Sequence, residues 1–311
     1  MSHHHFTRAG VLWKRPAPLA AAIVAVLMIV SCGSERGNPR YAAERKLFRA
    51  RKMKEDVVKG GMKPEFLAKA IDGYRRIVSD YGESASRDAD IEHLVVTAQM
   101  ELAELEFRAR LLRESRDDFE KAHALAKAVP PARANALYSA GVISEELGEH
   151  SAAAGYYERF FEEFLPLDSL AGTARMNPRY LVTPLKLADL ALRLDAPERA
   201  SRWLAEAEKT YRYIIAHESD TTLLKEARFN LLTSYLQQKK WNAALEFAGE
   251  LEKRYPSPRD LSALRFIEAR IHQDGTGDAR RALALYVSIA EKYPEGREAA
   301  DALLAAALMH K

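Results

Sequence analysis

The sequence predicts an all-α protein, an α-α superhelix in which helices stack in pairs. Apolar residues recur at three- and four-residue spacing from Tyr41 onward, which is the period of a helix with one buried face. Pro and Gly fall between these periodic segments, where helices end. No segment shows the sustained alternation of apolar and polar residues that is typical of a strand.

The first segment, residues 1–31, is predicted to be a targeting signal. Arg8, Lys14 and Arg15 precede the apolar run "APLAAAIVAVLMIV" at 17–30, and no acidic residue interrupts them. This order of charged and apolar regions is that of a secretory signal. As a helix the run would be about 21 Å long, shorter than the ~30 Å hydrocarbon layer. We therefore expect cleavage, and a retained signal anchor is the alternative.

The only cysteine of the chain directly follows this run. Ile29, Val30, Ser31 and Cys32 resemble a bacterial lipobox, in which the cysteine is lipidated after cleavage and becomes the new N-terminus. The resemblance implies cleavage between Ser31 and Cys32 and a membrane-anchored lipoprotein. In enteric bacteria Gly33 would direct such a protein to the outer membrane, facing the periplasm.

Residues 32–40 are expected to be the lipidated cysteine and a short polar linker. The linker "GSERGNPR" reaches about 27 Å at most when extended, which keeps the folded part near the bilayer. Removing 1–31 also removes three of the 47 basic residues and none of the 44 acidic ones, which leaves 44 of each. A neutral mature chain offers no general nucleic-acid-binding surface.

A repeat follows from 41 to the C-terminus at 311. "ARRALALYVSIAEKYP" and "WNAALEFAGELEKRYP" each place an alanine (Ala282, Ala244) twelve residues before a proline (Pro294, Pro256). Tyr286 stands four residues after the first alanine, and Ala248 holds the same place in the second copy. Weaker copies carry Ala70 and Tyr74, Gly141 with Ala153 and Tyr157, and Ala200 with Leu204.

This pattern resembles that of tetratricopeptide repeat proteins. Such repeats use a small residue to bring two helices together and an aromatic residue to fill the seam to the next pair. The intervals from Ala153 to Ala200, Ala244 and Ala282 are 47, 44 and 38 residues, longer than the usual period of about 34. We expect an irregular array of about six pairs, followed by a final helix in 296–311 that either caps the array or binds a partner.

The resemblance also implies a partner-binding face, since the first helix of each tetratricopeptide pair lines a concave groove. Such a groove suits an extended peptide or a helix of a protein partner. A carboxylate clamp for peptide C-termini is not expected, because Glu268 and Leu264 stand where basic residues are needed, although Asn230 is compatible. The residues expected to line the groove are Asn135, Tyr138, Val142, Glu145, Glu226, Phe229, Thr233, Leu236, Leu264, Ile267 and Ile271.

The sequence contains no motif that predicts catalysis, a cofactor or a metal site. The histidines beyond the signal, which we expect at partly exposed helix or turn positions, do not occur at metal-ligand spacing. Adjacent acids such as Asp117 and Asp118 point about 100° apart on a helix, so they are expected on a solvated face. The glycines of "GTGDAR" at 275–280 are expected in a turn that ends with Asp278 as a helix N-cap.

Two further clusters, one aromatic and one basic, are interpreted as follows. Tyr157, Phe160, Phe161 and Phe164 are expected in the repeat core. Eight basic residues and two acids lie between Glu35 and Lys54, and this arm is expected either to contact anionic headgroups or to form a solvated helix face.

Together these observations favour a non-enzymatic scaffold that holds a protein partner at a membrane. The chain is similar to outer-membrane assembly lipoproteins of the BamD-like group, which join a lipobox to about five such repeats. Assembly of outer-membrane proteins is therefore one expectation, and a scaffold for pilus assembly or polysaccharide export is an alternative. The helical part of a cell-wall lytic enzyme is a further alternative.

Overall fold

The computed structural model describes residues 38–165 and 177–309, and this part of the chain is helical without a strand. The predicted signal at 1–31 and Cys32 lie outside the described residues. The helices are α2 (Pro39–Lys59), α3 (Pro64–Ala85), α4 (Ala89–Arg108), α5 (Leu112–Leu125), α6 (Pro130–Glu146), α7 (His150–Phe164), η1 (Pro178–Val182), α9 (Thr183–Arg193), α10 (Pro197–His217), α11 (Thr221–Gln237), α12 (Trp241–Arg254), α13 (Pro258–Arg270), η2 (Ile271–Thr276), α14 (Ala279–Lys292) and α15 (Ala299–Met309).

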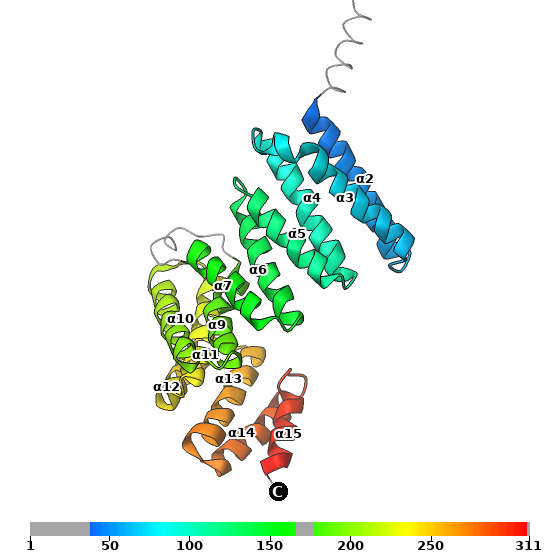
Figure 1. Ribbon diagram of the computed structural model, residues 1–311. Helices are drawn as coiled ribbons and strands as arrows, with labels where there is room; N and C mark the ends of the chain where they lie inside the picture. Colours follow the sequence, from blue (N-terminus) through cyan, green and yellow to red (C-terminus); the bar gives the residue numbers. More distant parts are fainter. Residues whose placement is uncertain (1–37, 166–176, 310–311) are drawn as a thin grey trace, which may run out of the picture. The chain divides into compact units, whose positions relative to one another are not determined.

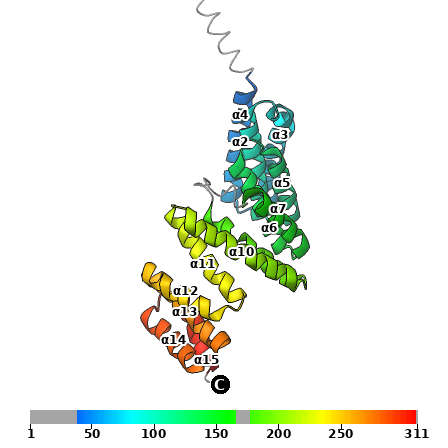
Figure 2. The same ribbon diagram turned by 90° about the vertical axis from the view of Figure 1, so that its left-hand side faces the viewer.

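The helices alternate along the chain as a first helix and a second helix (Figures 1 and 2). We call α2, α4, α6, α9, α11 and α13 first helices and α3, α5, α7, α10, α12 and α14 second helices, and α15 follows the last pair. Where contacts between helices are extensive, they join an element mainly to its immediate neighbours in the chain. Such nearest-neighbour packing defines a solenoid, so the predicted fold class is confirmed.

The contacts divide the chain into two compact units, 1–105 and 106–311, and the division falls within α4. In the first unit, α2, α3 and the second half of α4 share one core around the fully buried Tyr74 and Ile77. The second unit holds a large core from α6 to α13 and a smaller one around Tyr286 that includes α15. The sequence predicted a single repeat domain over 41–311.

The small residues of the predicted repeat lie in the helix seams. Ala70, Ala153, Ala244 and Ala282 are all fully buried. Gly141 on α6 faces the ring of Tyr157 on α7 so closely that an added Cβ would lie 2.7 Å from Tyr Cε1. A side chain at this position would therefore collide with the ring, and glycine lets the two helices approach.

Within each pair, the turn between the helices contains a residue in the left-handed conformation. Gly148 (φ 73°) and Gly277 (φ 71°) adopt it, but so do Arg110 (φ 62°), Asp195 (φ 56°) and Lys239 (φ 55°). After α6, α9 and α11 the following amide donates back to the last turn of the helix, as from Lys240 N to Tyr235 O (2.9 Å). This is the Schellman motif that commonly ends helices.

The connections between pairs are built differently. Asn177, Asp220 and Ser257 are extended N-caps whose side chains accept hydrogen bonds from backbone amides of the next helix. Such caps satisfy amides that have no partner within the helix. Within the last pair, Asp278 is also an N-cap, of α14, and it accepts from Arg281 N (3.0 Å), as the sequence predicted.

Candidate partner-binding face

The predicted groove residues lie on the first helices α6, α11 and α13 of the second unit and at the start of η2. Most are half-buried, which leaves part of each side chain open to solvent. Leu264 and Ile271 are instead fully buried in the core, and Tyr138 is 8% exposed. The resemblance to tetratricopeptide repeats implied one stripe of α13, but part of that stripe packs inward against the neighbouring helices.

At the start of this face, Tyr138 belongs to an aromatic cluster. Its ring centroid lies 5.4 Å from that of Tyr157 and 5.0 Å from that of Tyr180. The Arg179 guanidinium lies over both Tyr138 and Tyr180, and it donates to Asn135 Oδ1 (2.6 Å). Burial raises the pKa of Tyr138 to about 12, so its hydroxyl stays neutral. Arg179 was not predicted, because it lies in the short 3-10 helix η1, whose five residues show no helical period.

Glu145 is the acid that was expected to give this end of the groove a negative charge. Its carboxylate accepts a hydrogen bond from the Tyr157 hydroxyl and one from Lys186 Nζ (2.6 Å). The ammonium also lies 5.3 Å from the centre of the Tyr157 ring. Burial, followed by the hydrogen bond to Glu145, raises the pKa of Tyr157 well above its usual value. The charge of Glu145 is therefore compensated within the protein.

Further along, Phe229 of α11 is covered by a second aromatic residue and a cation. Its ring lies 5.8 Å from that of Tyr255, and Lys225 Nζ lies 5.3 Å from the Tyr255 ring centre. Lys225 also pairs with Asp260 (2.7 Å). The stem of Lys225 thus covers apolar surface while its charge is satisfied by an acid of the next pair.

A hollow of about 360 Å³ lies between α11 and α13. Thr233, Leu236, Ile267 and Ile271, four of the predicted groove residues, line it together. Trp241, Phe266, Gln237, Arg270 and Asp274 complete the lining. Its wall is therefore mainly apolar, with one cation and one acid among the lining residues, and this is the composition of a binding site for an apolar side chain.

Five of the nine lining residues were not predicted from the sequence, and Trp241 is the largest of them. It is the first residue of the second helix α12, whereas the predicted groove residues belong to first helices. The sequence feature that could have predicted this residue is a tryptophan directly after the turn within a pair. Its position brings the start of α12 into contact with the space between α11 and α13.

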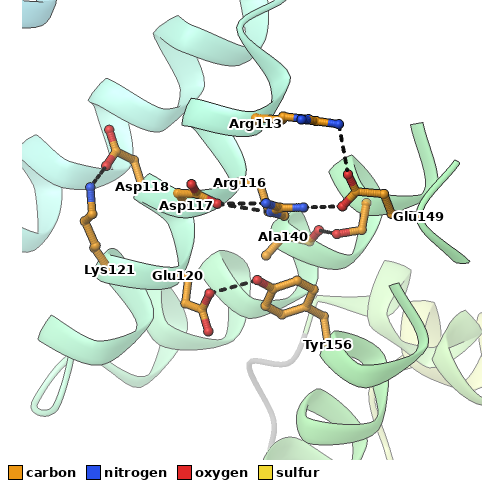
Figure 3. Close-up of polar contacts among 10 residues, drawn as sticks. Arg113, Arg116, Asp117, Asp118, Glu120, Lys121, Ala140, Glu149 and Tyr156 are labelled. Carbon is orange, nitrogen blue, oxygen red and sulfur yellow. Dashed lines mark hydrogen bonds and ion pairs between the residues drawn. The ribbon is translucent and has the colours of Figure 1, made fainter. Parts of the chain in front are cut away.

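The adjacent acid pairs do not converge on one point. Figure 3 shows Asp117 beside Arg116 (3.0 Å), while Asp118 bonds to Lys121 Nζ (2.6 Å). Arg116 also pairs with Glu149, the N-cap residue of α7 in the next pair. Asp118 is 4% exposed, so the expectation of a solvated face is wrong for this residue, which lies on the packed side of α5.

The histidines follow a similar division. His123 is buried and its Nε2 lies 3.0 Å from Glu163 Oε2, while Arg133 pairs with the other oxygen of this carboxylate. His272 is also buried, so the prediction of partial exposure is wrong for both. Among the described residues, no group of three His, Cys, Asp or Glu side chains is placed to hold a metal ion.

The aromatic set of α7 lies where the sequence predicted. Tyr157 and Phe160 are fully buried in the core of the second unit, and Phe161 and Phe164 pack against it. One repeat copy was overlooked, because Ser115 and Phe119 of α5 are buried at the same four-residue spacing. Within the described part of the chain, no helix combines the length and apolar character needed to cross a membrane.

Solved structures share this fold. A structure of BtubC (BKLC) from P. vanneervenii is 18% identical with a TM-score of 0.51, covering 74% of this chain and 91% of that one. A tetratricopeptide repeat protein from Parabacteroides merdae is 16% identical with a TM-score of 0.51, covering 80% of each chain. No protein-family model and no curated protein matches the chain. The chain is an α-α solenoid, and its fold is that of tetratricopeptide repeat proteins.

Proposed function

We propose that the protein is a non-catalytic scaffold that binds a protein partner on the first-helix face of its second unit. The observation that carries this proposal is the hollow between α11 and α13, where Thr233, Leu236 and Ile267 line a space beside Trp241. An aliphatic or aromatic side chain of an extended peptide or a helix fits such an apolar wall. Arg270 and Asp274, which pair with each other (3.8 Å), give the wall polar groups that can orient the peptide backbone.

The test fills the hollow without removing a core side chain. Thr233 is half-buried, and Thr233→Arg would extend a long side chain into the space. We expect this variant to lose partners that the native chain captures from solubilised membranes, with an unchanged melting temperature. Val287→Arg on the second helix α14, where the native valine is 38% exposed, is the control. Equal capture by all three proteins would refute the proposed site.

We propose further that the scaffold is a lipoprotein anchored through Cys32. The support is the lipobox resemblance of Ile29 to Cys32 behind a charged and an apolar region. Mass spectrometry of the mature N-terminus is expected to find an acylated cysteine, and an intact Met1 would exclude this anchor. Cys32→Ser is expected to release the protein from membranes in high salt, because attractions between exposed charges are screened there.

An outer-membrane, periplasm-facing location and a role in outer-membrane protein assembly are the specific form of this proposal. They rest on Gly33 and on the similarity to BamD-like lipoproteins described above. Capture of barrel-assembly components by the native chain, lost in Thr233→Arg, is the expected result. Capture of pilus or polysaccharide-export components alone would refute the assembly role.

A further inference from the structure

The outward face of α2 carries two large exposed aromatic residues. Tyr41 is 50% and Phe48 is 62% exposed. They are seven residues apart, which is about two turns, so they lie on the same side of the helix. The opposite side carries Ala43, Leu47 and Ala50, which are buried against the core of the first unit. The aromatic rings therefore take no part in holding this unit together.

The ion pairs divide the basic residues of α2 into two groups. Arg40, Lys46 and Arg51 extend toward the rest of the first unit and bind Asp90, Asp80 and Glu101, respectively. Lys54 also approaches Glu101 (3.7 Å). These pairs stabilise the packing of α2, and their charges are matched within the unit.

The second group lies beside the exposed aromatics. Arg45 and Arg49 are exposed and form no ion pair with a described residue. Lys52 lies 5.8 Å from the centre of the Phe48 ring, and it pairs with Glu55 (3.0 Å) in the following turn. With the period of an α-helix, Tyr41, Arg45, Phe48 and Lys52 lie along one side of α2. Arg45 lies between the two aromatic residues, and Lys52 lies one turn beyond Phe48. The outward side of the helix thus combines three cations with two aromatic rings, and the exposed acids Glu55 and Asp56 follow on the same side in the next turn.

We propose that the surface formed by Tyr41, Arg45, Phe48, Arg49 and Lys52, the α2 outer face, docks on an anionic phospholipid membrane. The Tyr41 ring, with its polar edge, suits the headgroup level, and the Phe48 ring can enter the apolar layer beneath it. Long cationic side chains reach phosphates while their stems lie against apolar surface. The opposite charge of the lipid supplies attraction. A merely solvated face would account for the three cations but not for the exposed phenyl ring of Phe48.

This proposal goes beyond the proposed function, since it requires neither a protein partner nor acylation of Cys32. The two ideas fit together in space, because α2 begins at Pro39, seven positions after Cys32. A lipid on Cys32 would hold the α2 outer face near the bilayer and raise its local concentration there. The outer face would then set which side of the first unit meets the membrane.

The test uses the unlipidated chain starting at Gly33, which keeps every described residue and lacks the apolar segment at 17–30. It is sedimented with vesicles of phosphatidylcholine alone and of phosphatidylcholine with phosphatidylglycerol. We expect binding to the anionic vesicles only, and weaker binding as salt increases. Absence of binding, or equal binding to both vesicles, would overturn the proposal. Because Cys32 is missing, neither result bears on the lipid anchor.

Matched variants separate docking from general electrostatic attraction. The double substitution Arg45→Gln and Arg49→Gln is expected to lower the partition coefficient about 30-fold, from about 1 kcal/mol for each cation. The control Arg202→Gln with Arg280→Gln removes the same charge from exposed positions of α10 and α14. It is expected to change the partition coefficient less than about twofold. An equal loss in both double variants would refute the proposed surface.

The aromatic contribution is tested in the same way. Phe48→Ser is expected to weaken vesicle binding about tenfold, from the lost burial of one large apolar side chain, with an unchanged circular dichroism spectrum. Leu192→Ser on α9 is the control, since Leu192 is 59% exposed. If Phe48→Ser abolishes capture of a protein partner but leaves vesicle binding unchanged, the occupant of this face is a protein and the lipid proposal is wrong.

Discussion

Gly141 gives the sharpest test of how the helices of a pair are held. A Cβ added there would lie 2.7 Å from Cε1 and 2.9 Å from Cδ1 of Tyr157, and Tyr157 is fully buried. Its hydroxyl donates to Glu145, so the ring is fixed at both ends. Overpacking of this kind costs about 1–3 kcal/mol, while alanine gains about 1 kcal/mol over glycine in a helix. We expect Gly141→Ala to destabilise by up to about 2 kcal/mol.

Gly155 supplies the matched control on α7, because a Cβ there would meet nothing within 4 Å. Gly155→Ala is expected to stabilise by about 0.5–1 kcal/mol. Urea unfolding followed by circular dichroism at constant m-value measures both changes. In a Tyr157→Leu background the ring is gone, and Gly141→Ala is then expected to become neutral or stabilising. If Gly141→Ala stabilises the native chain as much as Gly155→Ala, the proposed collision is wrong.

Three further changes test the packing and the charges. Burial alone would raise the pKa of Glu101, but hydrogen bonds from Arg51 and Tyr74 outweigh it and lower that pKa. The stability that this carboxylate contributes is therefore present above about pH 4.3, and it is lost as the pH falls through the lowered pKa. Urea midpoints against pH measure this loss, and Glu101→Gln should reduce it. Ala244→Leu, at a fully buried position, is expected to cost about 1–3 kcal/mol, and an unchanged urea midpoint would contradict the seam assignment. Leu303→Gln on α15, where the leucine is 58% exposed, should change thermal stability by less than about 0.5 kcal/mol, and a larger loss would show that this leucine belongs to the cap.

The sequence was informative where one physical requirement fixes one residue type. A buried helix seam needs a small side chain, and Ala70, Ala153 and Ala282 were placed correctly for that reason. In α10 the pattern identified Leu204, but the largest fully buried side chain there is Tyr211, which donates to Leu181 O of η1. Helical spacing does not predict this contact, because the acceptor Leu181 O lies in the irregular η1.

The candidate site was predicted less completely. The resemblance to tetratricopeptide repeats implied a common face for Thr233, Leu236 and Ile267, and these residues line one hollow. The same resemblance implied Leu264, which is fully buried, since a stripe wide enough to bury a helix also includes positions in the seam. Trp241 was missed because its contribution depends on where a turn places the start of α12.

The left-handed turns within pairs indicate which segments of this chain could be moved as units. Arg110, Asp195 and Lys239 occupy a conformation that costs about 1 kcal/mol for residues other than glycine, yet the turn is retained within the pairs. The capped connections between pairs differ in length and sequence. A pair joined by its rigid turn is therefore the natural module for duplication, deletion or grafting, and cuts placed at Asp220 or Ser257 would preserve whole modules, whereas cuts at Gly148 or Lys239 would divide them.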